Sequence, residues 1–135
     1  PTGSIVGFPY TSSGYADKTL YAKWIQKASV TGSKPTISGK TASTRTGTNK
    51  LTVKPGVWTG VPAPTFTYQW YLCTTQVKAM TPAIPKSCKA ITKQTKTSLP
   101  VVTAYRGKYL AVKVTGVSTG TPPTSYLTVS SAKVS

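Results

Sequence analysis

Residues 65–73 read TFTYQWYLC, and a large apolar side chain occupies every second position of this stretch. The apolar series is Phe66, Tyr68, Trp70 and Leu72, and the positions between them are mostly polar. In a β-strand, alternate side chains point to opposite faces, so this spacing places the apolar series on one face. The stretch therefore predicts a half-buried strand with a largely aromatic inner face.

Proline or glycine interrupts nearly every other stretch of the chain, and no long helical period survives these breaks. Val, Thr and Tyr, which favour strands, are abundant. The sequence thus predicts an all-β chain, and short strands separated by Pro and Gly turns are typical of a β-sandwich. About seven strands are expected, at 35–39, 50–54, 65–73, 89–92, 97–102, 108–116 and 125–134.

The same alternation selects the inward-facing residues of the other strands. It points Leu127 and Val129 inward in the last strand, whereas residues 55–64 are expected to form a turn. The predicted core consists of Phe66, Tyr68, Trp70, Leu72, Leu51, Val53, Leu110, Val112 and Val114.

The chain divides into an N-terminal segment, a linker and the sandwich. Residues 1–26 end in a strand-like run and predict a short β-strand or hairpin appendage. Residues 27–34 are small and polar and predict a linker, and residues 35–135 hold the sandwich. A strand with an apolar face can pair with a neighbouring chain. The candidate assembly residues, which share one parity of the first segment, are Leu20, Ala22 and Trp24.

The charge of the chain is strongly positive. Seventeen Lys and Arg residues face a single acid, Asp17, and the formal net charge is +16. One explanation of the lysines is that they keep the chain soluble and protect strand edges from pairing. Solubility, however, needs a net charge of only about 2–8 in a small domain. A surplus of this size predicts attraction to polyanions such as wall polymers or acidic polysaccharides. Because most of the cations are Lys, a diffuse electrostatic role is favoured over bidentate recognition.

Several lysines are candidate polyanion contacts because they lie on predicted strands or around the second cysteine. Lys108 is a candidate by position as well; it shares the inward parity of its strand and is expected at the end of a sheet. Nucleic acid is the least favoured partner, because no motif that reads bases is present. The candidate contacts are Lys50, Lys54, Lys86, Lys89, Lys93, Lys96 and Lys113.

The two cysteines, Cys73 and Cys88, lie at the ends of residues 74–87, which have no strand rhythm. In an extracellular setting they predict one disulfide that ties the ends of a long surface loop. Such a bridge differs from the inter-sheet disulfide of antibody domains. The alternative is a pair of buried free thiols.

The residue types that the chain lacks argue against catalysis. The chain has no His and a single acid, which removes His-based general bases, carboxylate pairs and a plausible metal site. We therefore expect no enzyme activity, no cofactor and no metal. Trp58 is interpreted as a lid at one end of the sandwich, whereas Trp24 remains a candidate for a carbohydrate-binding platform.

No stretch of about 18 apolar residues is present, so no membrane-spanning helix and no membrane insertion is expected. No signal peptide is evident either. The chain starts at Pro1 without a methionine, which indicates a processed chain, a fragment of a longer one or an engineered boundary.

Residues 35–134 resemble an immunoglobulin-like repeat of bacterial, especially actinobacterial, surface and secreted proteins. The resemblance is carried by KPTISG, LTVKPGVWTGVPAPTFTYQWYLC, a second Cys and RGKYLAVKVTG. It implies an immunoglobulin-like sandwich. The chain departs from the family pattern at Tyr105, where an acid is usual, and in its longer, proline-rich loop between the cysteines.

Residues 7–25, GFPYTSSGYADKTLYAKWI, resemble the last part of a Listeria–Bacteroides repeat, a small β-grasp-like module of bacterial surface proteins. Together the two resemblances imply an extracellular or cell-surface location and a structural role. The expected function is a non-catalytic structural or assembly module whose partners are neighbouring copies or modules of the same protein. The alternative is a basic adhesion module that binds acidic polysaccharide or wall polymer, or a carbohydrate.

Overall fold

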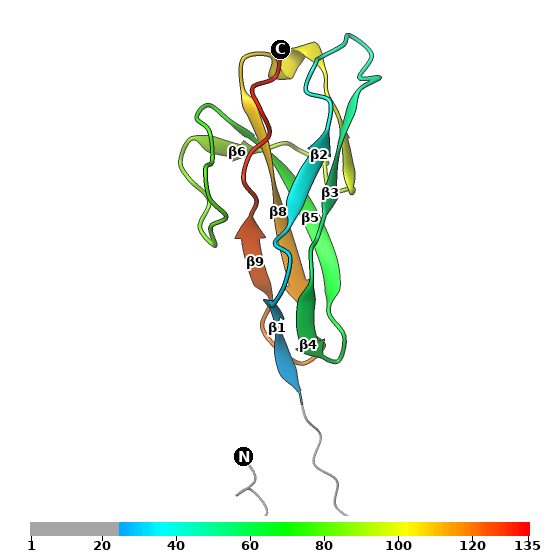
Figure 1. Cartoon of the computed structure of the whole chain (residues 1–135), viewed down its shortest axis with the longest axis vertical. Coiled ribbons are helices and arrows are strands. Elements are labelled where there is room, and N and C mark those ends of the chain that lie inside the picture. Colours follow the sequence, from blue (N-terminus) through cyan, green and yellow to red (C-terminus); the bar gives the residue numbers. More distant parts are fainter. Residues whose placement is uncertain (1–24) are drawn as a thin grey trace, which may run out of the picture.

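The computed structural model describes residues 25–135, and nearly all of its regular structure is β (Figure 1). A short 3₁₀ helix, η2 (Thr103–Tyr105), precedes β8. The strands are β1 (Gln26–Val30), β2 (Thr36–Gly39), β3 (Lys50–Lys54), β4 (Trp58–Val61), β5 (Thr65–Cys73), β6 (Cys88–Ala90), β7 (Ser98–Pro100), β8 (Tyr109–Val117) and β9 (Thr124–Leu127).

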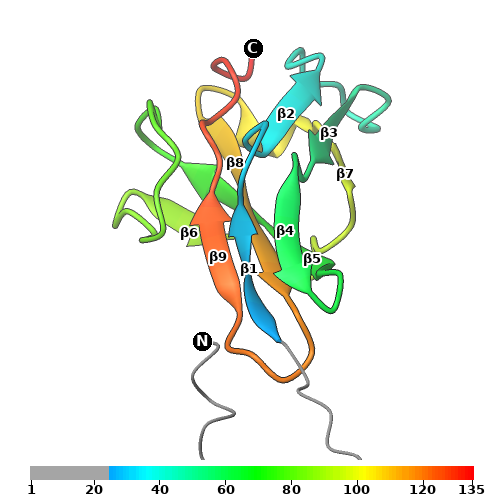
Figure 2. The same ribbon diagram turned by 60° about the horizontal axis from the view of Figure 1, so that its bottom comes forward.

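Two antiparallel sheets form an all-β sandwich, which confirms the predicted fold class. One sheet has the order β2-β3-β7, and the other has the order β6-β5-β8-β9. Their inner faces share one hydrophobic core. A separate ribbon, β1 paired with β4, lies at the end of the sandwich drawn at the bottom of Figure 1 and comes forward in Figure 2.

The main core follows the alternation in the sequence. In β3, Leu51 and Val53 are buried, and the residues beside them are exposed. In the facing sheet, Trp70 of β5 lies opposite Val112 of β8, and both are fully buried. Leu110 and Val114 are buried as well, so six of the nine predicted core residues are buried. The remaining predicted residues, Phe66, Tyr68 and Leu72, are half-buried and pack against it.

The predicted linker is wrong for its first part, because β1 lies within it. β1 pairs with β4, and Ala28 at its centre is fully buried. A Cβ at Gly60 of β4 would collide with Ser118 Oγ and would lie 3.3 Å from the Ala28 Cα. The small side chains that suggested a linker are thus the ones that let this strand pack closely. The folded unit extends to β1 and does not begin at residue 35.

The predicted turn at 55–64 contains β4, and Trp58 begins this strand. Its indole ring lies over Gly116 and meets Phe66 edge-on at a centroid distance of 5.4 Å. Its Nε1–H donates to the Pro55 carbonyl at 2.6 Å. Trp58 is therefore a lid on the core, as the sequence suggested, and its ring is engaged by neighbours within the sandwich.

The loop between the cysteines covers the outer face of the four-stranded sheet, where it makes a second small core. We name residues 74–87 the strap. Cys73 and Cys88 lie opposite each other on β5 and β6 and form the predicted disulfide, which ties the two ends of the strap. Val77 of the strap packs with both cysteines and with two residues of the sheet, Ala111 and Leu127. The strap is more than a surface loop, because it buries apolar side chains.

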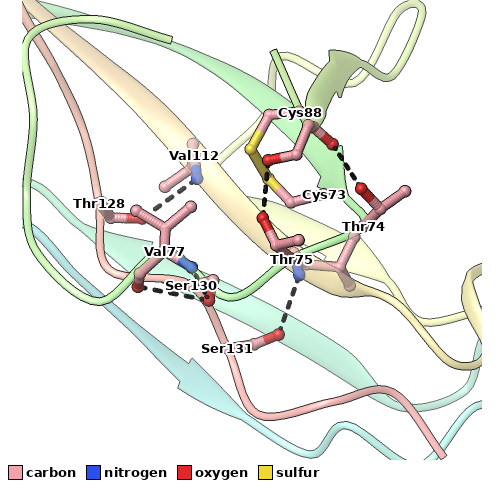
Figure 3. The surroundings of a disulfide bond; sticks show 11 residues. Cys73, Thr74, Thr75, Val77, Cys88, Val112, Thr128, Ser130 and Ser131 are labelled. Carbon is pink, nitrogen blue, oxygen red and sulfur yellow. Dashed lines mark hydrogen bonds between the residues drawn. A yellow bond between two sulfur atoms is a disulfide. The ribbon is translucent and has the colours of Figure 1, made fainter. Parts of the chain in front are cut away.

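Hydrogen bonds fix the strap to the far edge of the same sheet. Thr81 exchanges two backbone hydrogen bonds with Leu127, at 3.1 and 2.7 Å. The Val77 N–H donates to Ser130 Oγ at 3.0 Å, and the Ser130 N–H donates to the Val77 carbonyl (Figure 3). These bonds lead the strap from β5 across β8 to the edge at β9.

The last predicted strand is shorter than expected. β9 ends at Leu127, and the chain then follows β8 through side-chain bonds: the Val112 N–H donates to Thr128 Oγ1, and the Leu110 N–H donates to Ser131 Oγ, both at 3.1 Å. These hydroxyl groups take the place of strand carbonyls, so regular pairing stops. Within β9, Leu127 lies opposite Lys113 on the outer face of the sheet, so it is buried in the second core and not in the main core. Val129, predicted to face inward, is 46% exposed.

We predict that Gly116→Ala destabilises the sandwich, because a Cβ there would lie 2.8 Å from Trp58 Cζ3. Overpacking of a filled core lowers the free energy of unfolding by about 1–3 kcal/mol. Urea unfolding measures the change, with Thr67→Ala on the exposed face of β5 as the control. In a Trp58→Ala background the alanine at position 116 should cost less. An equal cost in both backgrounds would contradict this contact.

We also predict that reduction of the Cys73–Cys88 disulfide lowers the free energy of unfolding. The bridge spans 15 residues, and closing a loop of this size stabilises a chain by roughly 3 kcal/mol in the entropy model. Unfolding with and without reductant gives the difference. Hydrogen exchange should quicken at Val77 and Ala111 before it quickens at Trp70, because the second core loses its tie and the main core does not. Unchanged stability after complete reduction would contradict this.

Candidate functional site

The positive charge of the described sandwich has no acidic side chain to balance it. Lys18, Lys23 and Asp17 precede residue 25, so residues 25–135 keep 15 of the 17 cations and no Asp or Glu. No Lys or Arg of this part can therefore form an ion pair with an acidic side chain of the same part. The lysine-bearing parts of its surface attract anions over several ångströms of solvent.

Three of these lysines line one hollow at the disulfide end of the sandwich. We name it the three-lysine pocket; its volume is about 260 Å³. Lys89 on β6 lies opposite Leu72 on β5, and directly opposed residues share one face of a sheet. Lys108 comes two residues before Leu110, which lies opposite Leu72 from the other side, so it shares that face too. The pocket is lined by Leu72, Thr74, Lys86, Ser87, Lys89 and Lys108.

The strap end places the third lysine. The Cys88 N–H donates to the Pro85 carbonyl at 3.0 Å, which closes a tight turn that contains Lys86. The Thr74 N–H donates to the Ser87 carbonyl at 2.9 Å, and Thr75 Oγ1 donates to Ser87 Oγ at 2.8 Å. Figure 3 shows Thr74 and Thr75 beside the disulfide. The turn that bears Lys86 is thus held against the end of β5.

The structure brings together three of the predicted polyanion contacts, Lys86, Lys89 and Lys108. The other candidates do not line this pocket. Lys50 and Lys54 lie on the exposed face of β3, and Lys113 lies on the outer face of β8, opposite Gln69. Lys93 and Lys96 lie between β6 and β7.

A second hollow, which we name the edge groove, runs beside β2. Its volume is about 490 Å³. One wall comes from β2 and the residues before it, and the other comes from the strap and the chain after β9. Its lining is largely apolar and has a lysine on each wall. The lining residues are Lys34, Pro35, Thr36, Ile37, Lys78, Ala79, Met80, Val129 and Ser130.

The register shows that the backbone of Ile37 faces the groove side of β2. The Val53 N–H donates to the Thr97 carbonyl at 2.8 Å, so the N–H and C=O groups of Val53 point towards β7. Ile37 lies opposite Val53, so its own N–H and C=O point away from β3. In the described part of the chain, no strand pairs with that side of β2. An edge of this kind can accept an extended segment.

The predicted assembly residues Leu20, Ala22 and Trp24 lie outside the described residues. The same holds for the possible carbohydrate platform at Trp24. Trp58 does not offer a free stacking face, because it packs between Phe66 and Tyr126, with a centroid distance of 6.0 Å to the latter.

The two hollows offer lysine and apolar side chains to a bound molecule. Residues 25–135 contain no cluster of three or more metal-ligating side chains, and the chain has no histidine. Burial raises the pKa of the Tyr68 and Tyr105 phenols above the ordinary value, so neither becomes a phenolate near neutral pH. Across the same residues, no helix is long and apolar enough to cross a membrane.

Comparison with known proteins adds no assignment. No family model matches the chain, and no significant match was found among curated proteins or among solved structures.

Proposed function

We propose that the chain is a non-catalytic structural module of a bacterial cell-surface or secreted protein, and that it joins neighbouring copies or modules through the edge groove. The observation that carries this proposal is the unpaired side of β2 beside an apolar groove. Main-chain hydrogen bonds to a strand edge supply affinity, and side-chain pockets beside the edge supply specificity. Ile37 offers the backbone groups, and Met80 and Val129 offer the apolar wall.

The strand that enters the groove is proposed to be residues 18–24 of a second copy. From Lys18 to Val30 the sequence has no Gly or Pro, the usual residues of a tight reversal. A return of this segment to its own β2 would need such a reversal, so we expect it to reach the β2 of a second copy. The parity of Leu20, Ala22 and Trp24 suits insertion of one apolar face.

The extracellular setting and the finer fold are parts of the same proposal. A structural disulfide is typical of proteins outside the reducing cytosol, and the Cys73–Cys88 bridge supports that setting. The orders β2-β3-β7 and β6-β5-β8-β9 are compatible with an immunoglobulin-like sandwich of seven strands, with the β1-β4 ribbon as an addition. The bacterial surface origin rests on the sequence resemblance.

For assembly, we predict that the intact chain forms concentration-dependent oligomers that persist in high salt, because strand pairing is not electrostatic. Light scattering measures the mass. Leu20→Asp with Trp24→Asp should yield a monomer, since both charges would enter the apolar groove. Thr19→Asp with Tyr21→Asp adds the same charge on the opposite parity and should still assemble.

A variant of β2, the strand proposed to accept the incoming segment, tests the other half of the interface. Ile37→Pro removes the N–H that faces the groove and leaves the bonds from β2 to β3 in place, so it should block assembly while thermal unfolding shows a folded chain. A wild-type chain that stays monomeric at every concentration, or parity variants that behave alike, would refute the assembly proposal.

A second candidate function is attachment to acidic polymers such as wall polymer or acidic polysaccharide. The observation that favours it is the set of 15 cations without one acidic side chain in residues 25–135. Lysine ammonium groups attract anionic polymers without a fixed geometry, so many weak contacts share the binding.

For attachment, we predict that the chain binds dextran sulfate and does not bind neutral dextran. Release of counterions makes such binding steeply dependent on salt, so affinity should fall about tenfold or more between about 50 and 200 mM NaCl. Titrations followed by tryptophan fluorescence at several salt concentrations give the slope. Binding that is flat with salt, or equal for neutral dextran, would point to carbohydrate recognition and contradict the electrostatic mechanism.

A further inference from the structure

We propose that the three-lysine pocket is a specific subsite for one phosphate or sulfate group of an acidic polymer. The inference rests on the second candidate function and goes further, since it assigns a place and a ligand chemistry to part of a charge that is otherwise spread over the surface. The pocket gathers Lys86, Lys89 and Lys108 around one cavity of about 260 Å³.

The positions of the three lysines follow from pairing across the sheet. Lys89 shares a face with Leu72 because the two are directly opposed on β6 and β5. Lys108 approaches the same face from β8, and Lys86 comes from the end of the strap. The stretch 86–89 and the start of β8 thus bring their lysines to one hollow. Grouped like charges repel one another, and residues 25–135 supply no acidic side chain to relieve that repulsion, so a bound anion is the natural neutraliser.

The backbone at each lysine is held before any ligand arrives. The disulfide at Cys88 lies between Lys86 and Lys89 and ties both to β5. The Lys108 N–H donates to the Tyr105 carbonyl at 3.1 Å, and its own carbonyl accepts from the Val134 N–H at 2.8 Å. Only the lysine side chains remain to be ordered on binding, which lowers the entropic cost of holding an anion.

The lining suits a tetrahedral oxyanion attached to a larger chain. Ammonium groups act as point charges and need no planar, bidentate acceptor, so phosphate and sulfate oxygens suit them. Thr74 and Ser87, both polar, belong to the same lining. Leu72 and the aliphatic stems of the lysines give an apolar floor for the adjoining part of the polymer. The pocket therefore favours a charged group on a backbone that continues out of it.

The test compares two variants of the intact chain that lose the same charge. The pocket variant carries Lys86→Gln, Lys89→Gln and Lys108→Gln. The control variant carries Lys27→Gln, Lys40→Gln and Lys133→Gln, three exposed lysines that do not line the pocket. Both are titrated with dextran sulfate and, separately, with polyphosphate at about 150 mM salt, and circular dichroism and thermal unfolding report whether each is folded.

We expect the pocket variant to bind at least one of the two polymers about tenfold or more weakly than the control variant, and the polymer more affected identifies sulfate or phosphate as the preferred group. Equal losses in the two variants would overturn the subsite and leave diffuse attachment intact. If the wild-type chain binds neither polymer, attachment itself fails and the subsite fails with it.

A second measurement is independent of the variants and of their folding. Inorganic phosphate and inorganic sulfate are titrated into the wild-type chain, and backbone amide shifts are followed by NMR. Saturable shifts confined to Thr74, Lys86–Lys89 and Lys108 support the subsite. Shifts spread evenly over all exposed lysines would overturn it, because they would report general screening.

Discussion

The pairing of β5 with β8 is the interaction on which the rest of the structure depends. The two strands stay in register over their full length, from Thr65 opposite Val117 to Cys73 opposite Tyr109. Their inner faces supply Trp70 and Val112 to the main core, and their outer faces are partly buried beneath the strap. β6 adds to one side of this pair and β9 to the other. A pair that is apolar on its inner face and partly covered on its outer face can serve as the centre of a sandwich without any ion pair.

The two candidate sites lie where this central pair and its partner sheet leave surfaces uncovered. The three-lysine pocket forms where Leu72, near the end of β5, is only half-buried. The edge groove forms at the open side of the other sheet, where β2 has a single neighbour. Buried apolar area stabilises the fold, and the lysine side chains are not needed for that. They are therefore available to contact a molecule outside the sandwich. The strap contributes to both sites, because Lys86 lies at its end and Met80 at its middle.

Alternation in the sequence predicted those parts of the fold in which one face of a strand is apolar and the other is polar. Leu51, Val53 and Trp70 could be placed in the core for this reason. The pattern failed where packing depends on small side chains: Ala28 is buried because Gly60 leaves room for it, and a run of small residues looks like a linker. It also failed for Val77, whose burial depends on a disulfide-tied strap and has no periodic signal.

The candidate sites were harder to predict than the core, for a related reason. A lysine cluster depends on which segments meet, and Lys108 is distant in the sequence from Lys86 and Lys89. Composition indicated an anionic partner, and parity placed Lys108 at a sheet end, but only the cross-strand register joins it to Lys89. The free side of β2 could not be inferred either, because a sequence does not say which neighbour a strand lacks.

The lack of carboxylates and imidazoles in residues 25–135 also determines how this part of the chain responds to acidity. Side chains that ordinarily titrate between about pH 4 and pH 9 are Asp, Glu, His and free Cys, and here both cysteines are oxidised. Residues 25–135 therefore contain no side chain of these ordinarily titrating types. Acidification, which unfolds many proteins by protonating paired carboxylates, has no such groups to act on here. Ionic strength, which screens the lysine charges, is therefore the solution variable expected to govern how strongly this sandwich attracts anions.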